Sequence, residues 1–498
     1  MKSKMRAIGR NISGIIMTTV MITLVTCGGG GGGGADDSGD LPPDLQIYGS
    51  TPFQEWIPNN GTVDICNVEL TRSQNFHFDL NNYSKDPVNL TGTPLVEISG
   101  PDADLFVVTT QPHTPVIDGD YNNEATITFT PLTLGEKTAT VTIQSDDPDT
   151  SVFTFTIKGH GSSFKTVDSV GSVGRESSIA LNGNNVYLSY YDDTNYDLKF
   201  GKSIDSGVSW NKSVISTDCD RDKTAIRVNG SDVYICYKYS TLKFAKSTDG
   251  GATWPAANKK TIDSTGITGV SLSMANNGSS LYVSYVTNGA DFDELRFAKS
   301  TDGGTTWASS DMKLITVSYL LFHTSISVSG NNVAITYLDH ETGYLKCALS
   351  ADNGNTWSLA TVDNSVGIYL TEMSVAVNGN NVFISYYNDT DKCLRFAKST
   401  DFGTSWSAKT IKAGVSFVPY AVIGANSNSI YVLYYQGGIH LAKSNDSGAT
   451  WELSLIHLVS AYDLSITVTA DEHLGVSYFC NTPADLISGL SLDGGATW

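Results

Sequence analysis

Hydrophobic and polar residues alternate in short segments along most of the chain from residue 45 onward. Residues 186–190, Val-Tyr-Leu-Ser-Tyr, are typical, and similar segments recur at 233–237 and 281–285. Alternation with period two predicts β-strands, and turn signals such as Asp-Pro-Asp at 147–149 separate them. With 47 Gly, 24 Tyr and only 16% charged residues, the composition favours strands and turns. The sequence therefore predicts an all-β protein.

One motif, Ser-x-Asp-x-Gly-x-x-Trp, occurs seven times between residues 203 and 498 and accounts for seven of the eight tryptophans. In such a box, the Asp carboxylate can accept turn amides, the Gly can take positive φ, and the Trp ring can pack between neighbouring sheets. The boxes recur every 44 to 53 residues, which is the period of a propeller blade. We therefore predict a seven-bladed β-propeller over residues 163–498, in which the boxes are structural turns. The box aspartates are Asp205, Asp249, Asp302, Asp352, Asp401, Asp446 and Asp493.

Each repeat has an innermost strand, a Tyr-rich second strand, a third strand, the box and a fourth strand. The chain ends on the last box at Trp498, so the last repeat has no fourth strand of its own. Residues 164–168 match the segments that follow other boxes, such as 358–363. We predict that 164–168 pairs beside the third strand of the last blade, which would close the ring and remove two open edges. The chain is then expected to be complete at residue 498.

Residues 45–162 contain several short alternating strands, among them 125–130 and 153–157, as in an immunoglobulin-like β-sandwich. Residues 98–106, Ile-Ser-Gly-Pro-Asp-Ala-Asp-Leu-Phe, and 145–149, Ser-Asp-Asp-Pro-Asp, resemble the Hydin-type (ASH-like) immunoglobulin-like domain. The resemblance covers nearly all of this region, and it implies a spacer or adhesive role without catalysis.

The N-terminus has the pattern of an export signal. A positive segment is followed by the mostly apolar residues 12–26, which are too few to span a bilayer comfortably. Leu-Val-Thr-Cys at 24–27, followed by seven glycines, resembles a bacterial lipobox. This predicts a signal peptide over 1–26, lipidation at Cys27 and a flexible tether over 27–44. An ordinary secretory peptide with a chance Cys is the alternative. The lipoprotein interpretation places the chain at the bacterial outer membrane, with display at the cell surface as one option.

The net charge of -20 argues against nucleic acid and against adsorption to anionic lipid, because both need clustered Lys and Arg. Membrane attachment is then expected through the lipid alone, and the protein is expected to be a monomer. The cysteines show no Cys-x-x-Cys spacing, which speaks against a zinc ribbon or redox motif. Cys236 and Cys347 lie at strand positions and are interpreted as small core residues.

Two sets of polar residues are expected on the propeller face opposite the boxes. The links after the second strands are acidic, and Asp193, Asn195 and Asp197 alternate in one of them. Oxygen ligands at this spacing suggest a calcium site, and a solvated acidic rim is the alternative. No other cofactor is indicated.

The second set begins the innermost strands. Aligned repeats place these residues at one equivalent position, around the mouth of the central channel. They form either a polar pocket or a hydrated channel lining. They are Glu176, Lys223, Gly269, His323, Glu372, Tyr420 and Asp463.

The boxes resemble those of the sialidase-like (BNR-repeat) superfamily over about 335 residues. Sialidases of that family use a Tyr–Glu nucleophile pair, an Asp acid/base and three arginines that grip a carboxylate. The resemblance suggests Glu372 and Tyr420 as the pair, with Asp463 as a third catalytic residue. The Arg-Ile-Pro motif of that family is missing from the chain. Arg296 and Arg395 occupy strand positions that are Lys elsewhere and are interpreted as surface residues. Only Arg175, Arg221 and Arg227 remain for a triad.

These observations leave three hypotheses. The favoured one is a lipid-anchored display module whose propeller binds a glycan or surface protein. Its ligand-binding candidates are Glu176, Lys223, His323, Arg175 and Arg221. The second is a glycoside hydrolase of sialidase type that uses ring carboxylates. The third is a purely structural envelope protein, which an apolar plug in the channel would favour.

Overall fold

The computed structural model describes residues 45–49, 55–118, 123–265, 267–289, 291–321, 323–367, 372–415, 420–457, 459–481 and 483–498. These residues form 37 strands and three short 3-10 helices, η1 (Ala103–Leu105), η2 (Ala256–Asn258) and η3 (Ser309–Asp311), with no α-helix among them. The predicted all-β class is confirmed. The predicted signal peptide, Cys27 and the tether lie outside the described residues. In the described part of the chain, no helix is long and apolar enough to span a bilayer.

Residues 45–162 form two sheets around one core. The order is β2-β1-β4-β7-β6 in one sheet and β3-β9-β8-β5 in the other. Strands β3 and β9 pair in parallel. Phe78 and Phe155, one from each sheet, meet edge to face with 5.6 Å between ring centroids. The strands are β1 (Leu45–Gly49), β2 (Glu55–Ile57), β3 (Gly61–Glu69), β4 (Gln74–Asn82), β5 (Val96–Ser99), β6 (Phe106–Thr110), β7 (Glu124–Phe129), β8 (Gly135–Gln144) and β9 (Val152–Ser162).

The described residues from 165 onward form seven four-stranded antiparallel sheets, one for each box repeat. The first four repeats contain β11 (Val173–Asn182), β12 (Asn185–Asp192), β13 (Asp197–Ser203) and β14 (Asn211–Ser216); β15 (Ala225–Asn229), β16 (Asp232–Tyr239), β17 (Thr241–Ser247) and β18 (Lys259–Asp263); β19 (Ile267–Asn277), β20 (Ser280–Asn288), β21 (Asp293–Ser300) and β22 (Met312–Ser318); and β23 (Thr324–Ser329), β24 (Asn332–Asp339), β25 (Tyr344–Ser350) and β26 (Ser358–Asp363). The remaining strands are β27 (Ser374–Asn378), β28 (Asn381–Asn388), β29 (Cys393–Ser399) and β30 (Ser407–Ala413); β31 (Ala421–Ala425), β32 (Ile430–Tyr435), β33 (Ile439–Ser444) and β34 (Glu452–His457); and β35 (Ala461–Val468), β36 (Leu474–Asn481) and β37 (Ala484–Ser491), joined by β10 (Lys165–Asp168).

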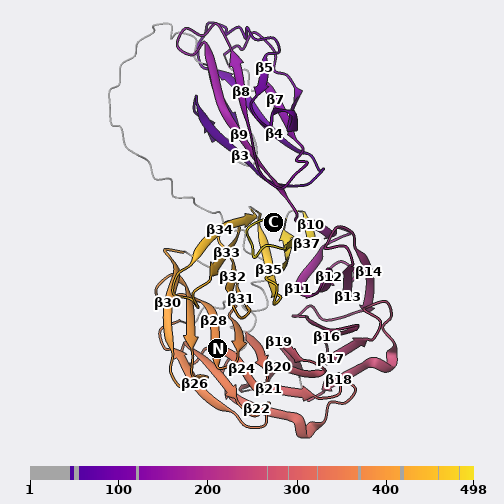
Figure 1. Cartoon of the computed structure of the whole chain (residues 1–498). Coiled ribbons are helices and arrows are strands. Elements are labelled where there is room, and N and C mark those ends of the chain that lie inside the picture. Colours follow the sequence, from indigo (N-terminus) through magenta and orange to yellow (C-terminus); the bar gives the residue numbers. More distant parts are fainter. Residues whose placement is uncertain are drawn as a thin grey trace.

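These sheets follow one another around a ring, as in a β-propeller, with the first strand of each sheet nearest the centre (Figure 1). The cores lie between consecutive sheets. One cluster combines Tyr187 and Phe200 of one sheet with Val233 and Ile235 of the next. Trp254 adds its ring edge to Phe200 at a centroid distance of 5.1 Å. The box tryptophans therefore stabilise the contact between sheets, as predicted.

Each box is held by hydrogen bonds to its Ser and Asp. In the first box, Ser203 Oγ donates to Asp205 Oδ1 at 2.7 Å, and the Gly207 amide donates to Ser203 Oγ at 2.8 Å. The amide and hydroxyl of Ser209 donate to the two oxygens of Asp205 at 2.9 and 2.6 Å. Hydrogen bonds from Ser209 and Ser203 lower the pKa of Asp205 to about 2. All seven boxes have Ser or Thr at the position of Ser209, a regularity that the motif used for prediction left out.

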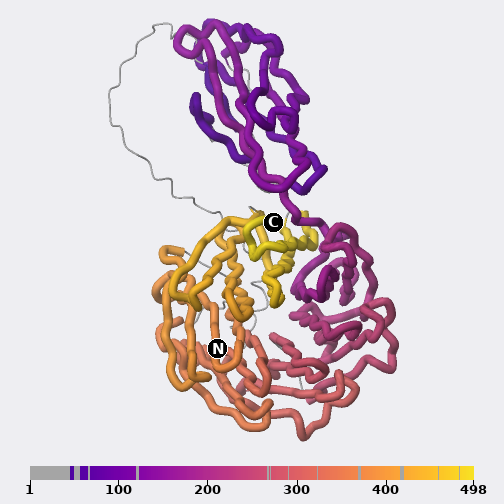
Figure 2. The backbone as a smooth tube through the Cα atoms, viewed as in Figure 1, coloured from indigo at the N-terminus to yellow at the C-terminus, as the bar shows by residue number. Residues whose placement is uncertain are grey.

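The N-terminal strand of the repeat region closes the ring. Strand β10 pairs antiparallel with β37, with Thr166 opposite Ile487, as the sequence predicts. In Figure 2 the yellow end of the chain lies beside the magenta strand where the ring begins. Phe164, just before β10, stacks between the rings of Trp498 and His457, at centroid distances of 5.6 and 4.6 Å. Packing of aromatic rings thus reinforces the strand pairing.

Carboxylates at the ends of fourth strands link neighbouring sheets. Asp363 accepts hydrogen bonds from Tyr386 at 2.7 Å and from Arg395 at 2.8 Å, both on the following sheet. Asp263 accepts one from Tyr285 at 2.7 Å and lies 3.9 Å from Arg296. The interpretation of Arg296 and Arg395 as surface residues was wrong, because their side chains lie partly buried between sheets.

Cysteines fill core positions in the propeller. Cys236 and Cys347 are buried, and neither forms a disulfide. The structure confirms their interpretation as small core residues.

Candidate functional site

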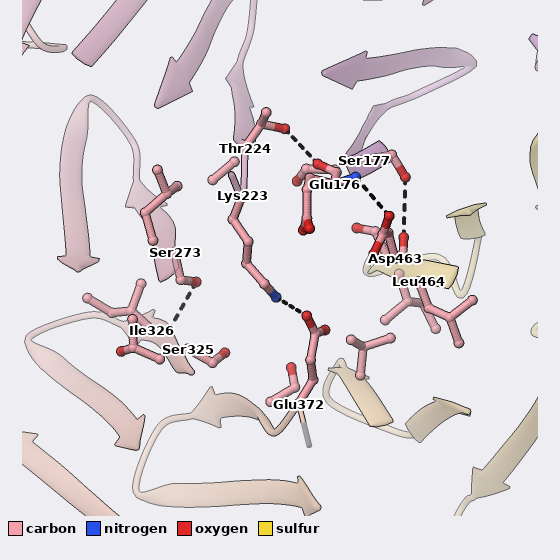
Figure 3. Close-up of a pocket in the computed structure, with 18 of the residues that line it drawn as sticks. Glu176, Ser177, Lys223, Thr224, Ser273, Ser325, Ile326, Glu372, Asp463 and Leu464 are labelled. Carbon is pink, nitrogen blue, oxygen red and sulfur yellow. Dashed lines mark hydrogen bonds and ion pairs between the residues drawn. The ribbon is translucent and has the colours of Figure 1, made fainter. Parts of the chain in front are cut away.

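The innermost strands begin around one end of the central channel (Figure 3). In six repeats the predicted ring residue lies two positions before the residue that pairs with the middle of the second strand. The third repeat differs: Ser273 pairs with Ser284, so Ser271 occupies the ring position. The placement of Gly269 there was wrong. The ring consists of Glu176, Lys223, Ser271, His323, Glu372, Tyr420 and Asp463.

Three inner strands contain a bulge at the ring position. Glu176, Ser271 and Asp463 have φ values of 52°, 52° and 56°, and the pairing registers of β11, β19 and β35 shift around them. A left-handed backbone is costly for residues other than glycine and often occurs at functional sites. The bulge lets the Glu176 amide donate to Asp463 Oδ2 at 3.2 Å. Alternation alone does not indicate this contact.

An ion pair spans the channel from the second to the fifth repeat. Lys223 Nζ lies 2.5 Å from Glu372 Oε1, and their side chains are 27% and 10% exposed. Burial lowers the pKa of Lys223, but the charges of Glu372 and Glu176 outweigh burial and raise the pKa above its ordinary value. Lys223 is therefore charged at neutral pH, and its ion pair with Glu372 lies across this end of the channel.

A chain of alternating charges runs along one side of the ring. Arg221 Nη1 lies 3.2 Å from Asp193 Oδ2, which is 3.9 Å from Arg175 Nε. Arg175 Nη1 lies 3.6 Å from Asp463 Oδ2, and the Tyr420 hydroxyl donates to Asp463 Oδ1 at 3.1 Å. This network combines donors, acceptors and aromatic rings from four repeats.

Arg175 is held mainly by stacking. Its guanidinium carbon lies 3.8 Å from the Phe479 ring centroid and 5.3 Å from that of Tyr462. Such contacts stabilise a cation by about 2 kcal/mol when it is desolvated. The Nε atom of Arg175 is buried and has no hydrogen-bond partner among the described residues. The guanidinium therefore keeps an unused donor.

The pKa values of Glu176 and Tyr420 are both raised. Burial and the negative charge of Asp463 raise the pKa of Glu176 well above 4.5. Burial and the charges of Asp463, Glu372 and Glu176 raise the pKa of Tyr420 well above 10. The shift favours the protonated form of Glu176, and Tyr420 acts as a hydrogen-bond donor.

The predicted nucleophile pair does not form. Tyr420 donates to Asp463, while Glu372 pairs with Lys223 from across the channel. The sequence alignment assigned both residues to the ring but did not indicate their partners. The three arginines also separate, because Arg175 and Arg221 meet at Asp193 while Arg227 lies inside the channel cavity.

His323 also lies in the ring, where burial and the charge of Lys223 lower its pKa to about 3. Its imidazole is therefore neutral at neutral pH. Its Nδ1 atom is buried without a hydrogen-bond partner among the described residues. His323 thus offers an uncharged polar group to the ring.

The three residues predicted to bind calcium have other partners. Asp193 pairs with Arg221, and the Asn195 side chain donates to Asp192 at 2.9 Å. Asp197 begins β13 opposite Asp192. The described residues contain no group of three His, Cys, Asp or Glu side chains that could hold a metal ion. The predicted calcium site is therefore not assembled in the structure.

Below the ring, the cavity is lined by serine side chains from the inner strands. Ser178 Oγ accepts the Ile226 amide at 3.3 Å, and Ser325 Oγ accepts the Val375 amide at 3.2 Å. Each bond joins one sheet to the next and satisfies an amide on the free edge of an inner strand. In the sequence, these contacts are marked by serines at the starts of several inner strands.

No protein-family model matches the sequence, and no curated protein is similar to it. The solved structures that resemble the fold include YCF48 bound to D1 peptide, with 14% identity and a TM-score of 0.46 over 67% of this chain and 96% of that one. The polysaccharide lyase Uly1 shares 10% identity with a TM-score of 0.45, over 66% of this chain and 91% of that one. The phage phi92 endosialidase shares 11% identity with a TM-score of 0.43, over 67% and 70%. Likenesses at this level leave the residues and ligands of this chain undetermined.

Proposed function

We propose that this chain is an outer-membrane lipoprotein in which an immunoglobulin-like sandwich carries a seven-bladed Asp-box propeller that binds a glycan. The export signal, the lipobox at Cys27 and the Gly-rich tether support the anchor. The domains are 1–26, 27–44, 45–162 and 163–498.

The observation that supports glycan binding best is the composition of the ring. Arg175, Asp463 and Tyr420 offer donors and acceptors within one connected network. Tyr420 and Tyr462 stand edge to face at 6.4 Å, and rings of this kind can pack against a sugar. Binding sites for sugars combine a few placed polar groups with aromatic side chains. A structural protein without a ligand would need an apolar plug, whereas the described residues place an ion pair across the channel.

A glycan array probed with the purified chain tests this proposal. Wild-type protein should bind a restricted set of glycans, and Tyr420→Phe and Asp463→Asn should weaken that binding at least tenfold. Glu136→Gln is the matched control, because Glu136 is an exposed carboxylate on the sandwich. Glycan binding that is unchanged in both ring variants, or no binding at all, would reject the proposal.

Glycoside hydrolysis is a second candidate, which one observation favours. Burial and the charge of Asp463 raise the pKa of Glu176, while Asp463 accepts hydrogen bonds from Tyr420 and from the Glu176 amide. A protonated acid beside a second carboxylate is the pair that glycosidases use. Turnover of a panel of fluorogenic glycosides, lost in Glu176→Gln and in Asp463→Asn, would establish hydrolysis. Binding without turnover would leave the protein a binding module.

A further inference from the structure

The channel cavity below the ring contains a cation without a counter-charge. The cavity has a volume of about 160 Å³ and is lined by Arg227 together with ring residues and serines of the inner strands. Arg227 Nη1 donates to the Ile226 carbonyl at 2.7 Å. Among the described residues, no carboxylate forms an ion pair with Arg227. Arg227 is only partly buried, and a partly buried guanidinium without a counter-charge is less stable than a paired one.

The other ionisable groups of the cavity do not supply that counter-charge. Glu372 is paired with Lys223, and Asp463 is paired with Arg175. Burial and the charge on Asp463 raise the pKa of Glu176, which favours its neutral form. Burial lowers the pKa of Arg227 to about 10, and no carboxylate charge counters that effect. Arg227 therefore has no ion-pair partner among the described carboxylates that line the cavity.

The hydroxyl groups around Arg227 are arranged as donors. Ser178, Ser273, Ser325 and Ser465 each use Oγ to accept an amide from the next inner strand, at 3.2 to 3.3 Å. A hydroxyl that accepts one hydrogen bond still has its proton to donate. None of these four hydroxyls donates to a protein acceptor in the described part of the chain. The cavity wall therefore offers O–H and N–H donors to whatever occupies it.

We propose that the central channel binds a small inorganic anion such as chloride, held by the Arg227 guanidinium and by hydroxyls of the surrounding serines. This site shares its cavity with residues of the ring, but the inference does not depend on the proposed glycan binding. The anion neutralises Arg227 and accepts the free serine protons. Its binding therefore stabilises the inner strands from which these side chains extend.

The test is the thermal unfolding of the purified full chain in chloride at constant ionic strength, with the bulky sulfonate MOPS as the replacing anion. An anion that binds only the folded state stabilises it saturably, raising the folding equilibrium constant about 100-fold at a concentration of 100 Kd. Wild-type protein should show this saturable rise in the melting temperature. Arg227→Met, which removes the charge and keeps the length of the side chain, should abolish it.

The matched control is Arg395→Met. Arg395 is also a partly buried guanidinium of the propeller, but it lies on a third strand and is paired with Asp363. This variant should lower stability equally in both salts and keep the chloride dependence. A chloride effect that survives in Arg227→Met would overturn the proposal.

Crystals of the wild-type protein soaked in sodium bromide give a direct measurement that does not need a variant to fold. An anomalous peak within hydrogen-bond distance of the Arg227 guanidinium is expected. Ordered water there in place of bromide, at bromide concentrations that saturate the melting-temperature shift, would refute the anion site.

Discussion

Closure of the ring should depend on Phe164 more than on any single strand pair. Its side chain is 3% exposed and stacks on Trp498 and His457. The ring also packs against bare backbone, because a Cβ built on Gly489 would lie 2.3 Å from Phe164 Cε1. Phe164→Ala would thus leave a cavity between the first and last segments of the propeller.

The expected cost follows from that burial. Truncation of a buried Phe to Ala destabilises a protein by about 3–5 kcal/mol, from lost transfer free energy and the cavity that remains. Trp498 and His457, which stack on Phe164, are themselves part of the contact that closes the ring, so they cannot easily move into the cavity that Phe164→Ala leaves. We therefore expect Phe164→Ala to lower the free energy of unfolding of the propeller by about 3–5 kcal/mol.

Urea unfolding followed by tryptophan fluorescence measures this loss, because seven of the eight tryptophans lie in the boxes. Phe292→Ala is the matched control, since Phe292 is 55% exposed. A loss in Phe164→Ala no larger than that of a typical surface substitution, about 0.5 kcal/mol, would show that strand pairing alone closes the ring.

Three further predictions concern protons and glycines. Burial lowers the pKa of His457 to about 4, so between pH 6.5 and 4 the unfolded chain binds a proton that the folded chain does not. The free energy of unfolding should therefore fall by about 1.4 kcal/mol per pH unit as the pH is lowered through this range. An unchanged slope in His457→Phe would contradict this. Burial and Asp463 raise the pKa of Glu176, so the stability that this group contributes is present at low pH and is lost as the pH rises through the folded pKa. In calorimetry at alkaline pH, Glu176→Gln should therefore unfold at a higher temperature than the wild type. Equal melting temperatures at pH 9 would speak against a raised pKa of Glu176. Gly251 and Gly278 both have positive φ, but a Cβ at Gly251 would lie 2.3 Å from the Phe200 ring, while one at Gly278 would meet nothing within 4 Å. In urea unfolding, Gly251→Ala should therefore lower the free energy of unfolding by about 1–3 kcal/mol more than Gly278→Ala does. Equal losses would exclude the clash.

The repeat pattern predicts the sheets because each box combines a turn with an inter-sheet contact. The residues of one box are local in sequence, so their hydrogen bonds and their period can be inferred from spacing. The pairing of β10 with β37 was also predictable, since 164–168 carries the pattern of a fourth strand. Both inferences depend on alternation and on unpaired edges, which are properties of single segments.

The partners within the ring could not be predicted in the same way. Lys223 and Glu372 belong to repeats on different sides of the channel, so their contact depends on the diameter of the ring. The links of Arg296 and Arg395 to the preceding sheets depend on the angle between neighbouring sheets. A linear pattern contains neither quantity, and the interpretation of both arginines as surface residues failed for this reason.

The bulges explain why the network of charged and polar side chains lies on one side of the ring. In a regular inner strand the edge amides point into the channel, and serines of the preceding sheet satisfy them, as Ser178 does for Ile226. At Glu176 the bulge replaces this arrangement, because its amide binds the carboxylate of Asp463 instead. That carboxylate pairs with Arg175, accepts a hydrogen bond from Tyr420 and, together with burial, raises the pKa of Glu176. The strained backbone at two neighbouring inner strands is thus the local cause of the network on which we expect a glycan to bind.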